Sequence, residues 1–415
     1  MKELFKNKAF VRYFVADNIG KIADNYFFVF LAWLALQQTG SPAMVGALLM
    51  ANAIPRLILL LVGGNIADKI APQVILRVGN IAQAAGLALI LIGMLSGGVP
   101  ILSLFIIAIV FGMVDAFSLP ASISAIPRIV PKSLLLKANS LVQGTEMASF
   151  TAGVLVAGLV LQFDNLVVAT IINLVLYVGA ALLFFTVKLK FHSDENDEES
   201  GHSEIKRIKT GLIYTWKNPV LRANIILMAS TNLAMSGPVS IGFLLLVTDK
   251  LALGPAMYTI LFAGFGIGVL IGAVLAGFLR QVNHPGRLVV FDYIISGIAF
   301  ISFGIIANYS LLLIVCVAVG ILGGVASTVV ATWTQLHTKP SMLGRVGSVT
   351  MIAMFAFDPI SQGATGFVAE WSIEGLFIAS GLFILVMTVL VVWFNPIFLR
   401  RESLVLKQQD IPPVI

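Results

Sequence analysis

Three ionisable residues lie within one long apolar stretch near the start of the chain. Asp17, Lys21 and Asp24 fall inside residues 9–36. An ionised side chain at the centre of a bilayer costs about 2.5–3.5 kcal/mol on insertion scales. A chain keeps such groups where they face a polar interior, pair with one another or handle an ion. The chemistry to expect from carboxylates and an amine in this setting is proton exchange along a transport pathway.

The spacing of the three residues leaves two interpretations open. Asp17 and Asp24 are seven residues apart, so they share one face of a helix, and Lys21 is close enough to pair with either. In the first interpretation the charges neutralise one another and steady helix packing. In the second, Asp24 exchanges a proton while Lys21 or Arg56 alternately holds it.

Arg56 and Asp358 are charged residues beside prolines in two other apolar stretches. Arg56 follows Pro55, and Asp358 precedes Pro359. Proline bends a helix and frees a backbone carbonyl. Arg56 can hold an acid of the first span, or Asp358 from the other half of the chain. Such a pair is either a gate that breaks on opening or a static contact.

Two further acids, Asp115 and Glu146, lie in the fourth and fifth apolar stretches. Glu146 is a candidate proton carrier or ligand for a cationic substrate. The simpler alternative is that both acids pair with bases such as Arg128 near the membrane surface. We therefore expect proton coupling at Asp24, Glu146 and Asp358.

Neutral polar and aromatic residues mark a candidate substrate cavity. Asn232 and Ser236, with Gly237 and Pro238, interrupt the seventh span, as expected of a broken helix beside a cavity. Aromatic residues of the first span offer a wall for an amphipathic molecule, although lipid-facing packing explains most such residues. The predicted cavity residues are Asn25, Tyr26, Gln143, Asn232, Ser236, Trp333 and Gln335.

The elements that must position these residues are membrane-spanning helices. Of 415 residues, 59% are hydrophobic and 11% charged, with a mean hydropathy of +0.99. Backbone groups in lipid must satisfy their own hydrogen bonds, which favours helices. The hydropathy pattern predicts twelve spans: 9–36, 43–64, 72–96, 100–127, 138–162, 166–188, 219–248, 255–280, 287–307, 310–336, 345–369 and 374–397.

Basic residues predict the orientation of these spans. Nearly all of the 26 Lys and Arg residues fall at alternate span ends, so both termini and the central loop should be cytoplasmic. The net charge of +6 reflects this topology and does not indicate nucleic-acid binding. We expect a multi-pass protein of the bacterial inner membrane.

The chain divides into two similar halves. The predicted units are a six-helix bundle over 1–190, an acidic cytoplasmic linker over 191–210, a second bundle over 211–400 and a tail over 401–415. The loop with Pro127-Arg128 corresponds to the one with Gly344-Arg345 in the second half. Such parallel duplication is typical of transporters. No cofactor, metal site or enzymatic centre is expected, because the single Cys316 has no metal-binding spacing and Ser-His-Asp and phosphate-loop patterns are absent.

Short motifs add a resemblance to a known family. The segment Gly63-Gly64-Asn65-Ile66-Ala67-Asp68-Lys69 resembles the loop signature of the major facilitator superfamily. Ile126–Pro131 and Gly344–Ser348 are similar to segments of the branch with macrolide efflux proteins and the enterobactin exporter. The chain departs from the family at Ala23-Asp24 and in having Asp115, not an arginine, in the fourth span. The residues predicted to act as counter-charges or gating groups are Asp17, Lys21, Arg56, Asp68, Lys69, Asp115, Arg128 and Arg345.

Together these observations predict an all-α membrane protein of the major facilitator fold, with two pseudo-symmetric six-helix bundles. The resemblance implies a monomeric secondary transporter that exports an amphipathic drug, macrolide or siderophore by proton antiport. Its expected partners are this substrate, protons and membrane lipids. A lysophospholipid flippase and a non-transporting membrane sensor are the alternatives.

Overall fold

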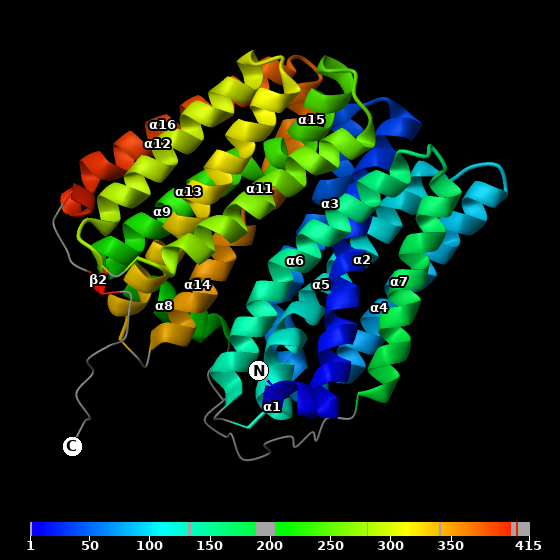
Figure 1. Ribbon diagram of the computed structural model, residues 1–415, viewed down its shortest axis with the longest axis horizontal. Helices are drawn as coiled ribbons and strands as arrows, with labels where there is room; N and C mark the ends of the chain where they lie inside the picture. Colours follow the sequence, from blue (N-terminus) through cyan, green and yellow to red (C-terminus); the bar gives the residue numbers. More distant parts are fainter. Residues whose placement is uncertain are drawn as a thin grey trace.

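The first half of the chain folds into long apolar helices joined by short loops (Figure 1). The computed structural model describes residues 2–131, 134–187, 204–279, 281–339, 342–399 and 404–405. The helices of the first half are α1 (Lys2–Lys6), α2 (Lys8–Thr39), α3 (Pro42–Lys69), α4 (Pro72–Leu95), α5 (Ile101–Ile129), α6 (Leu135–Leu161) and α7 (Leu166–Thr186).

The second half contains the same number of spans, two of them irregular. Its helices are α8 (Glu204–Lys217), α9 (Pro219–Gly237), the π-helical turns η3 (Pro238–Gly242) and η4 (Leu246–Lys250) around α10 (Phe243–Leu245), α11 (Pro255–Ala276), α12 (Pro285–Ile305), α13 (Tyr309–Leu336), α14 (Leu343–Phe355), α15 (Asp358–Ala369), α16 (Ile373–Phe394) and the 3₁₀ turn η6 (Pro396–Leu399). Two short strands, β1 (Gln281–Val282) and β2 (Leu404–Val405), pair antiparallel with Gln281 opposite Val405.

Twelve of these segments are long and apolar enough to cross a membrane, which confirms the number of predicted spans and the all-α class. Local signals set their ends. The Asn7 side chain accepts hydrogen bonds from the first backbone N–H groups of α2, and Gly40 ends that helix in the left-handed conformation, with φ of 62°. Asn218 caps α9 in the same manner as Asn7 caps α2.

The helix contacts repeat from one half to the other. In the first bundle α3 packs on α5, α4 on α7 and α2 on α6. The corresponding pairs in the second bundle are α11 with α13, α12 with α16 and α9 with α15. The duplication inferred from the loops is therefore present in the packing.

The two most extensive contacts between the bundles are those of α3 with α15 and of α6 with α11. Glycine at positions 46 and 366 lets the first pair pack closely. A Cβ on Gly46 would lie only 2.9 Å from Gly366 Cα. Near this crossing, Ser41 Oγ donates to Glu370 Oε1 over 2.7 Å. In Figure 1 the bundles meet at this end, whereas the lower ends of α6 and α14 lie apart. We call the lower end, with α1 and α8, the basic side.

Three features differ from the predicted elements. The seventh span continues through Pro238 as π-helical turns, so it is irregular without being interrupted. The eleventh span is divided into α14 and α15, and Asp358 begins α15. The predicted acidic linker over 191–210 overlaps a helix, since α8 begins at Glu204; residues 191–203 lie outside the described residues.

Close helix packing in the first bundle predicts that replacement by alanine destabilises the protein at one glycine and not at another. A Cβ at Gly112 of α5 would overlap the Asn52 carbonyl oxygen of α3, whereas a Cβ at Gly179 of α7 meets nothing within 4 Å. Gly112→Ala should lower the free energy of unfolding by about 1–3 kcal/mol, as overpacking does. Thermal unfolding in detergent measures this, with Gly179→Ala as the matched control. Equal stability of the two variants would contradict the packing.

Candidate functional site

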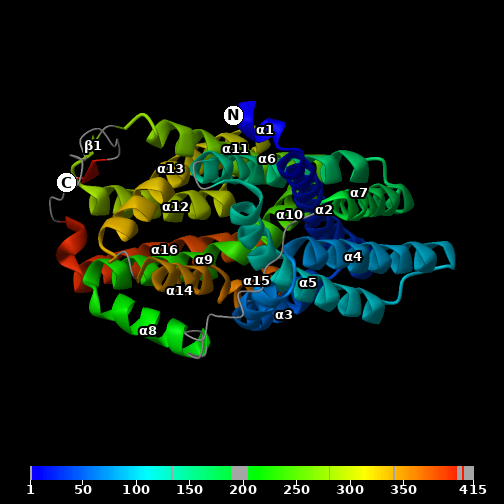
Figure 2. The same ribbon diagram turned by 90° about the horizontal axis from the view of Figure 1, so that it is seen from below.

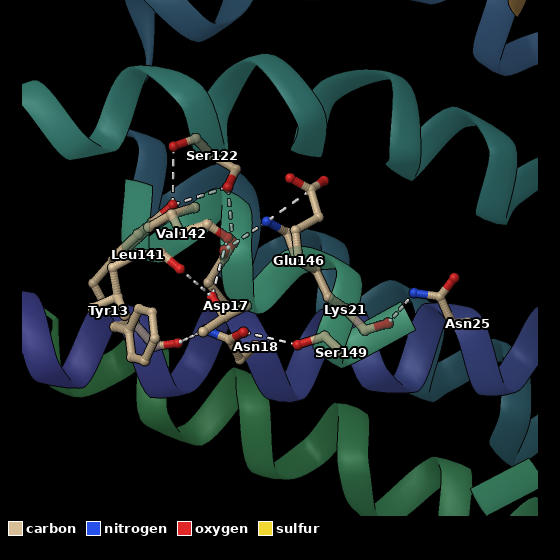
Figure 3. Close-up of polar contacts among 12 residues, drawn as sticks. Tyr13, Asp17, Asn18, Lys21, Asn25, Ser122, Leu141, Val142, Glu146 and Ser149 are labelled. Atoms are coloured by element: carbon tan, nitrogen blue, oxygen red, sulfur yellow. Dashed lines mark hydrogen bonds and ion pairs between the residues drawn. The ribbon is translucent and has the colours of Figure 1, made fainter. Parts of the chain in front are cut away.

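The charges of the first span form two separate groups. In the first group, Lys21 Nζ lies 3.1 Å from Asp17 Oδ2 and 3.9 Å from Glu146 Oε1 (Figure 3). Asp17 is 6% exposed and also accepts a hydrogen bond from Ser122 Oγ at 2.9 Å. Lys21 is therefore the counter-charge of Asp17 and Glu146. The expectation that it pairs with Asp24 is not supported.

Asp24 belongs to the second group, which faces the interior of the first bundle. Its Oδ1 accepts hydrogen bonds from Tyr177 OH at 2.8 Å and from Gln83 Nε2 at 3.0 Å. The same Gln83 nitrogen lies 3.4 Å from Asp115 Oδ1. Two carboxylates from α2 and α5 thus meet at one amide group, with donors supplied by α4 and α7.

Gln83 and Tyr177 are not among the site residues predicted from the sequence. Gln83 is a polar residue in an apolar span, and that signal was available from the sequence. Tyr177 had no such signal, because it is one aromatic residue among many in an apolar helix. Its hydroxyl group becomes informative only when the fold places it against a carboxylate.

Arg56 and Asp358 connect the two bundles. Arg56 Nη2 lies 3.0 Å from Asp358 Oδ2, and the guanidinium also lies over the Phe355 ring, 5.0 Å from its centroid. Asp358 is buried in the first turn of α15, where the break after α14 presents its carboxylate to α3. Of the two partners considered for Arg56, the structure shows the one in the opposite half.

Arg56 also lies between two cavities. A cavity of about 640 Å³ separates the bundles, and one of about 210 Å³ lies within the first bundle. The larger cavity is lined by Arg56, Asp358, Asn25, Asn232, Ser236 and mainly by apolar residues, including Phe28, Phe150, Phe262, Met147, Met228, Met235 and Met354. The smaller one is lined by both charge groups and Arg56: Asp17, Lys21, Asp24, Asp115, Glu146 and Gln83 among them.

Three predicted cavity residues lie elsewhere. Tyr26 is fully buried within the first bundle and its hydroxyl donates to the Ala169 carbonyl over 3.0 Å. Trp333 is buried at the basic side against the Phe398 ring, 5.3 Å between centroids. Gln335 is exposed at the end of α13. These residues were predicted from polarity and aromatic character, which do not specify the direction in which a side chain points.

The remaining predicted gating residues lie near the basic side. Arg128 is half-buried in the last turn of α5, and Arg345 is exposed in the first turn of α14 with Nη1 3.6 Å from Met342 Sδ. Asp115 meets Gln83 of α4 and Glu146 meets Lys21 of α2, so both acids contact partners on neighbouring spans, whereas the simpler expectation was pairing with loop bases such as Arg128. The side chains of Asp68, Lys69 and Gln143 lie outside the described part of the structure.

The Arg56–Asp358 pair predicts a measurable coupling energy. Removing one partner leaves the other charge without compensation and removes a charge-assisted hydrogen bond, so Arg56→Gln and Asp358→Asn should each destabilise the protein by about 2 kcal/mol. The double variant should cost less than the sum of the two. Unfolding of the unmodified protein, the two single variants and the double variant in detergent gives the four free energies of a double-mutant cycle. Additive losses would show that the two side chains do not stabilise one another.

Comparisons with known proteins agree with this architecture. The family model of the Major Facilitator Superfamily matches residues 18–358. An uncharacterised MFS-type transporter, y4rN of Sinorhizobium fredii (strain NBRC 101917 / NGR234), is 24% identical over 372 residues, covering 89% of this chain and 90% of that protein. The enterobactin exporter EntS of Escherichia coli is 22% identical over 308 residues, covering 74% of this chain and 72% of EntS.

Two solved structures share the fold at 12% sequence identity. The nucleoside transporter NupG has a TM-score of 0.68, covering 94% of this chain and all of NupG. A POT family transporter in complex with 5-aminolevulinic acid has a TM-score of 0.71, covering 94% of this chain and 96% of that one. With the family match over most of its length, its two six-span bundles and the cavity between them, this chain belongs to the Major Facilitator Superfamily of membrane transporters.

Proposed function

We propose that this protein is a proton-coupled exporter of an amphipathic small molecule and that it works by alternating access. The observation that carries the proposal is the Arg56–Asp358 ion pair, which joins the bundles between the central cavity and the acid-lined cavity. A charge in this position can respond both to the substrate and to the protonation of nearby acids. Intramembrane ionisable groups of this kind are typical of proton relays.

In the proposed cycle, Asp24 and Asp115 carry the transported proton. Both line the acid cavity together with Arg56, and both meet Gln83. When these acids are ionised, their charge competes with Asp358 for Arg56. When a proton is bound, that competition falls and Arg56 remains with Asp358, which holds α3 against α15. Protonation is thereby coupled to the contact between the bundles.

The central cavity favours a substrate with a large apolar part. Phenylalanine and methionine side chains form most of its apolar wall, and methionine adapts to ligands of different shape. Asn25, Asn232 and Ser236 supply neutral hydrogen-bonding groups. Similarity to the enterobactin exporter supports export, and hence a drug, macrolide or siderophore as substrate.

We further propose that the protein works as a monomer in the bacterial cytoplasmic membrane with both termini on the cytoplasmic side. The alternation of basic residues along the sequence supports this orientation. The structure has a cavity between the bundles, and the Ser41–Glu370 contact lies at the end opposite the basic side. In the proposed orientation, this is the conformation that loads substrate from the cytoplasm.

Transport by the purified protein in liposomes tests the proposal. We expect an imposed proton gradient to drive accumulation of a lipophilic fluorescent substrate, with counter-flow of protons measured by an internal pH dye. If substrate moves only down its own gradient and protons do not move, proton coupling is wrong. If lysophospholipid crosses without a proton gradient and the fluorescent substrates do not, the protein is a lipid facilitator instead.

The role of Asp24 has its own test. Asp24→Asn retains a similar shape but cannot exchange a proton, so proton-driven transport should fall at least about 100-fold, as expected for loss of an essential acid–base group. Substrate exchange without a gradient should persist. Asp164→Asn, in the loop before α7, is the matched control and should transport normally. Unchanged coupling in Asp24→Asn would remove this residue from the proton pathway.

A further inference from the structure

The helix α8 connects the two bundles and uses one face to hold the second bundle. Gly211 and Thr215 are buried, and a Cβ on Gly211 would lie 2.6 Å from the Arg345 carbonyl oxygen of α14. Tyr214 OH accepts a hydrogen bond from the Lys339 backbone N–H at 3.1 Å. This face is therefore fastened to α14 and to the loop before it.

The opposite face of α8 carries apolar side chains that the described residues leave uncovered. Leu212, Ile213 and Trp216 are 48%, 47% and 56% exposed. With the exposed Lys209 they occupy positions i, i+3, i+4 and i+7, so they form one stripe. We call these four residues the outer stripe. The exposed Lys217 lies beside it at the end of the helix.

The position of α8 indicates what this stripe faces. Figure 2 shows α8 at the rim of the second bundle beside α14, and α8 also contacts α9 and, in the first bundle, α3. Asn218 directly follows α8 and caps α9, which is the start of a membrane-spanning segment. The outer stripe therefore lies at the edge of the bundle and at the depth of the membrane surface on the basic side.

A helix with lysines, a tryptophan and aliphatic residues on one face is typical of binding in the plane of the membrane interface. Tryptophan prefers the headgroup level, and lysine beside it attracts anionic lipids. A second copy of the chain is a weaker occupant. Three apolar side chains over two helical turns offer much less than the roughly 800 Å² per partner that a stable interface buries.

We propose that the outer stripe of α8 binds anionic phospholipid in the membrane leaflet on the basic side. Leu212, Ile213 and Trp216 enter the interface, while Lys209 and Lys217 contact phosphate groups. The leaflet then holds α8 against the membrane, and the Gly211–Arg345 contact transmits that restraint to α14. Because α14 is followed by α15, which begins at Asp358, lipid binding acts on the helix next to the one that carries the ion pair between the bundles.

A fluorescent reporter on the outer stripe tests this proposal. The full-length protein with Cys316→Ser and Ile213→Cys, labelled with an environment-sensitive dye, is placed in nanodiscs of phosphatidylcholine alone or mixed with phosphatidylglycerol. We expect blue-shifted emission and protection from acrylamide quenching that increase with phosphatidylglycerol. Adding Lys209→Gln and Lys217→Gln should reduce this protection roughly five-fold or more. The matched control, with Lys209→Arg and Lys217→Arg, should retain the protection.

Three results would overturn the proposal. The first is a reporter that is quenched equally in both lipid mixtures. The second is protection that is the same in the Gln and Arg pairs, since lysine charge would then have no part in it. The third is protection that appears in both lipids together with elution of the labelled protein as a dimer, since a second copy would then cover the stripe. Monodisperse elution of each variant verifies that it is folded.

Discussion

The ion pair of Arg56 with Asp358 is the interaction on which the arrangement of the two bundles depends. Either charge is costly in an apolar span without a partner, and among the described residues each has its ion-pair partner in the other half of the chain. The pair therefore has a stable position only while α3 and α15 are in contact. Separation of the bundles requires another partner for at least one of the two charges.

The first bundle contains two acids, Asp24 and Asp115, that are alternative partners for Arg56. Lys21 is engaged by Asp17 and Glu146, so Asp24 and Asp115 are left with neutral donors. Arg56 lines the cavity that holds these two acids as well as the cavity that it shares with Asp358. In the proposed cycle, this distribution lets one arginine connect proton binding with the contact between bundles.

The matched helix contacts show that both bundles share one architecture, but the site is not symmetric. The acid group lies in the first bundle, whereas the irregular spans lie in the second. These are the π-helical turns after Gly237 and the break between α14 and α15 before Asp358. Gly237 N–H donates to Ser361 Oγ over 2.8 Å, so these two irregular segments are fastened to one another. A bundle that holds the acid group thus faces one in which two spans are irregular.

Hydropathy alone determined the twelve spans, because a membrane allows only long apolar helices. The free-energy cost of a charge in an apolar span identified Asp24, Arg56 and Asp358 as candidate functional residues. Their partners were not predictable: helical spacing left Lys21 free to pair with Asp17 or Asp24, and only packing of α6 against α2 brought Glu146 beside it. Gln83, Tyr177 and the burial of Tyr26 and Trp333 likewise depend on which face of each helix meets a neighbour. Sequence periodicity describes one helix at a time, whereas a site between helices is decided by their rotation and contacts in the folded protein.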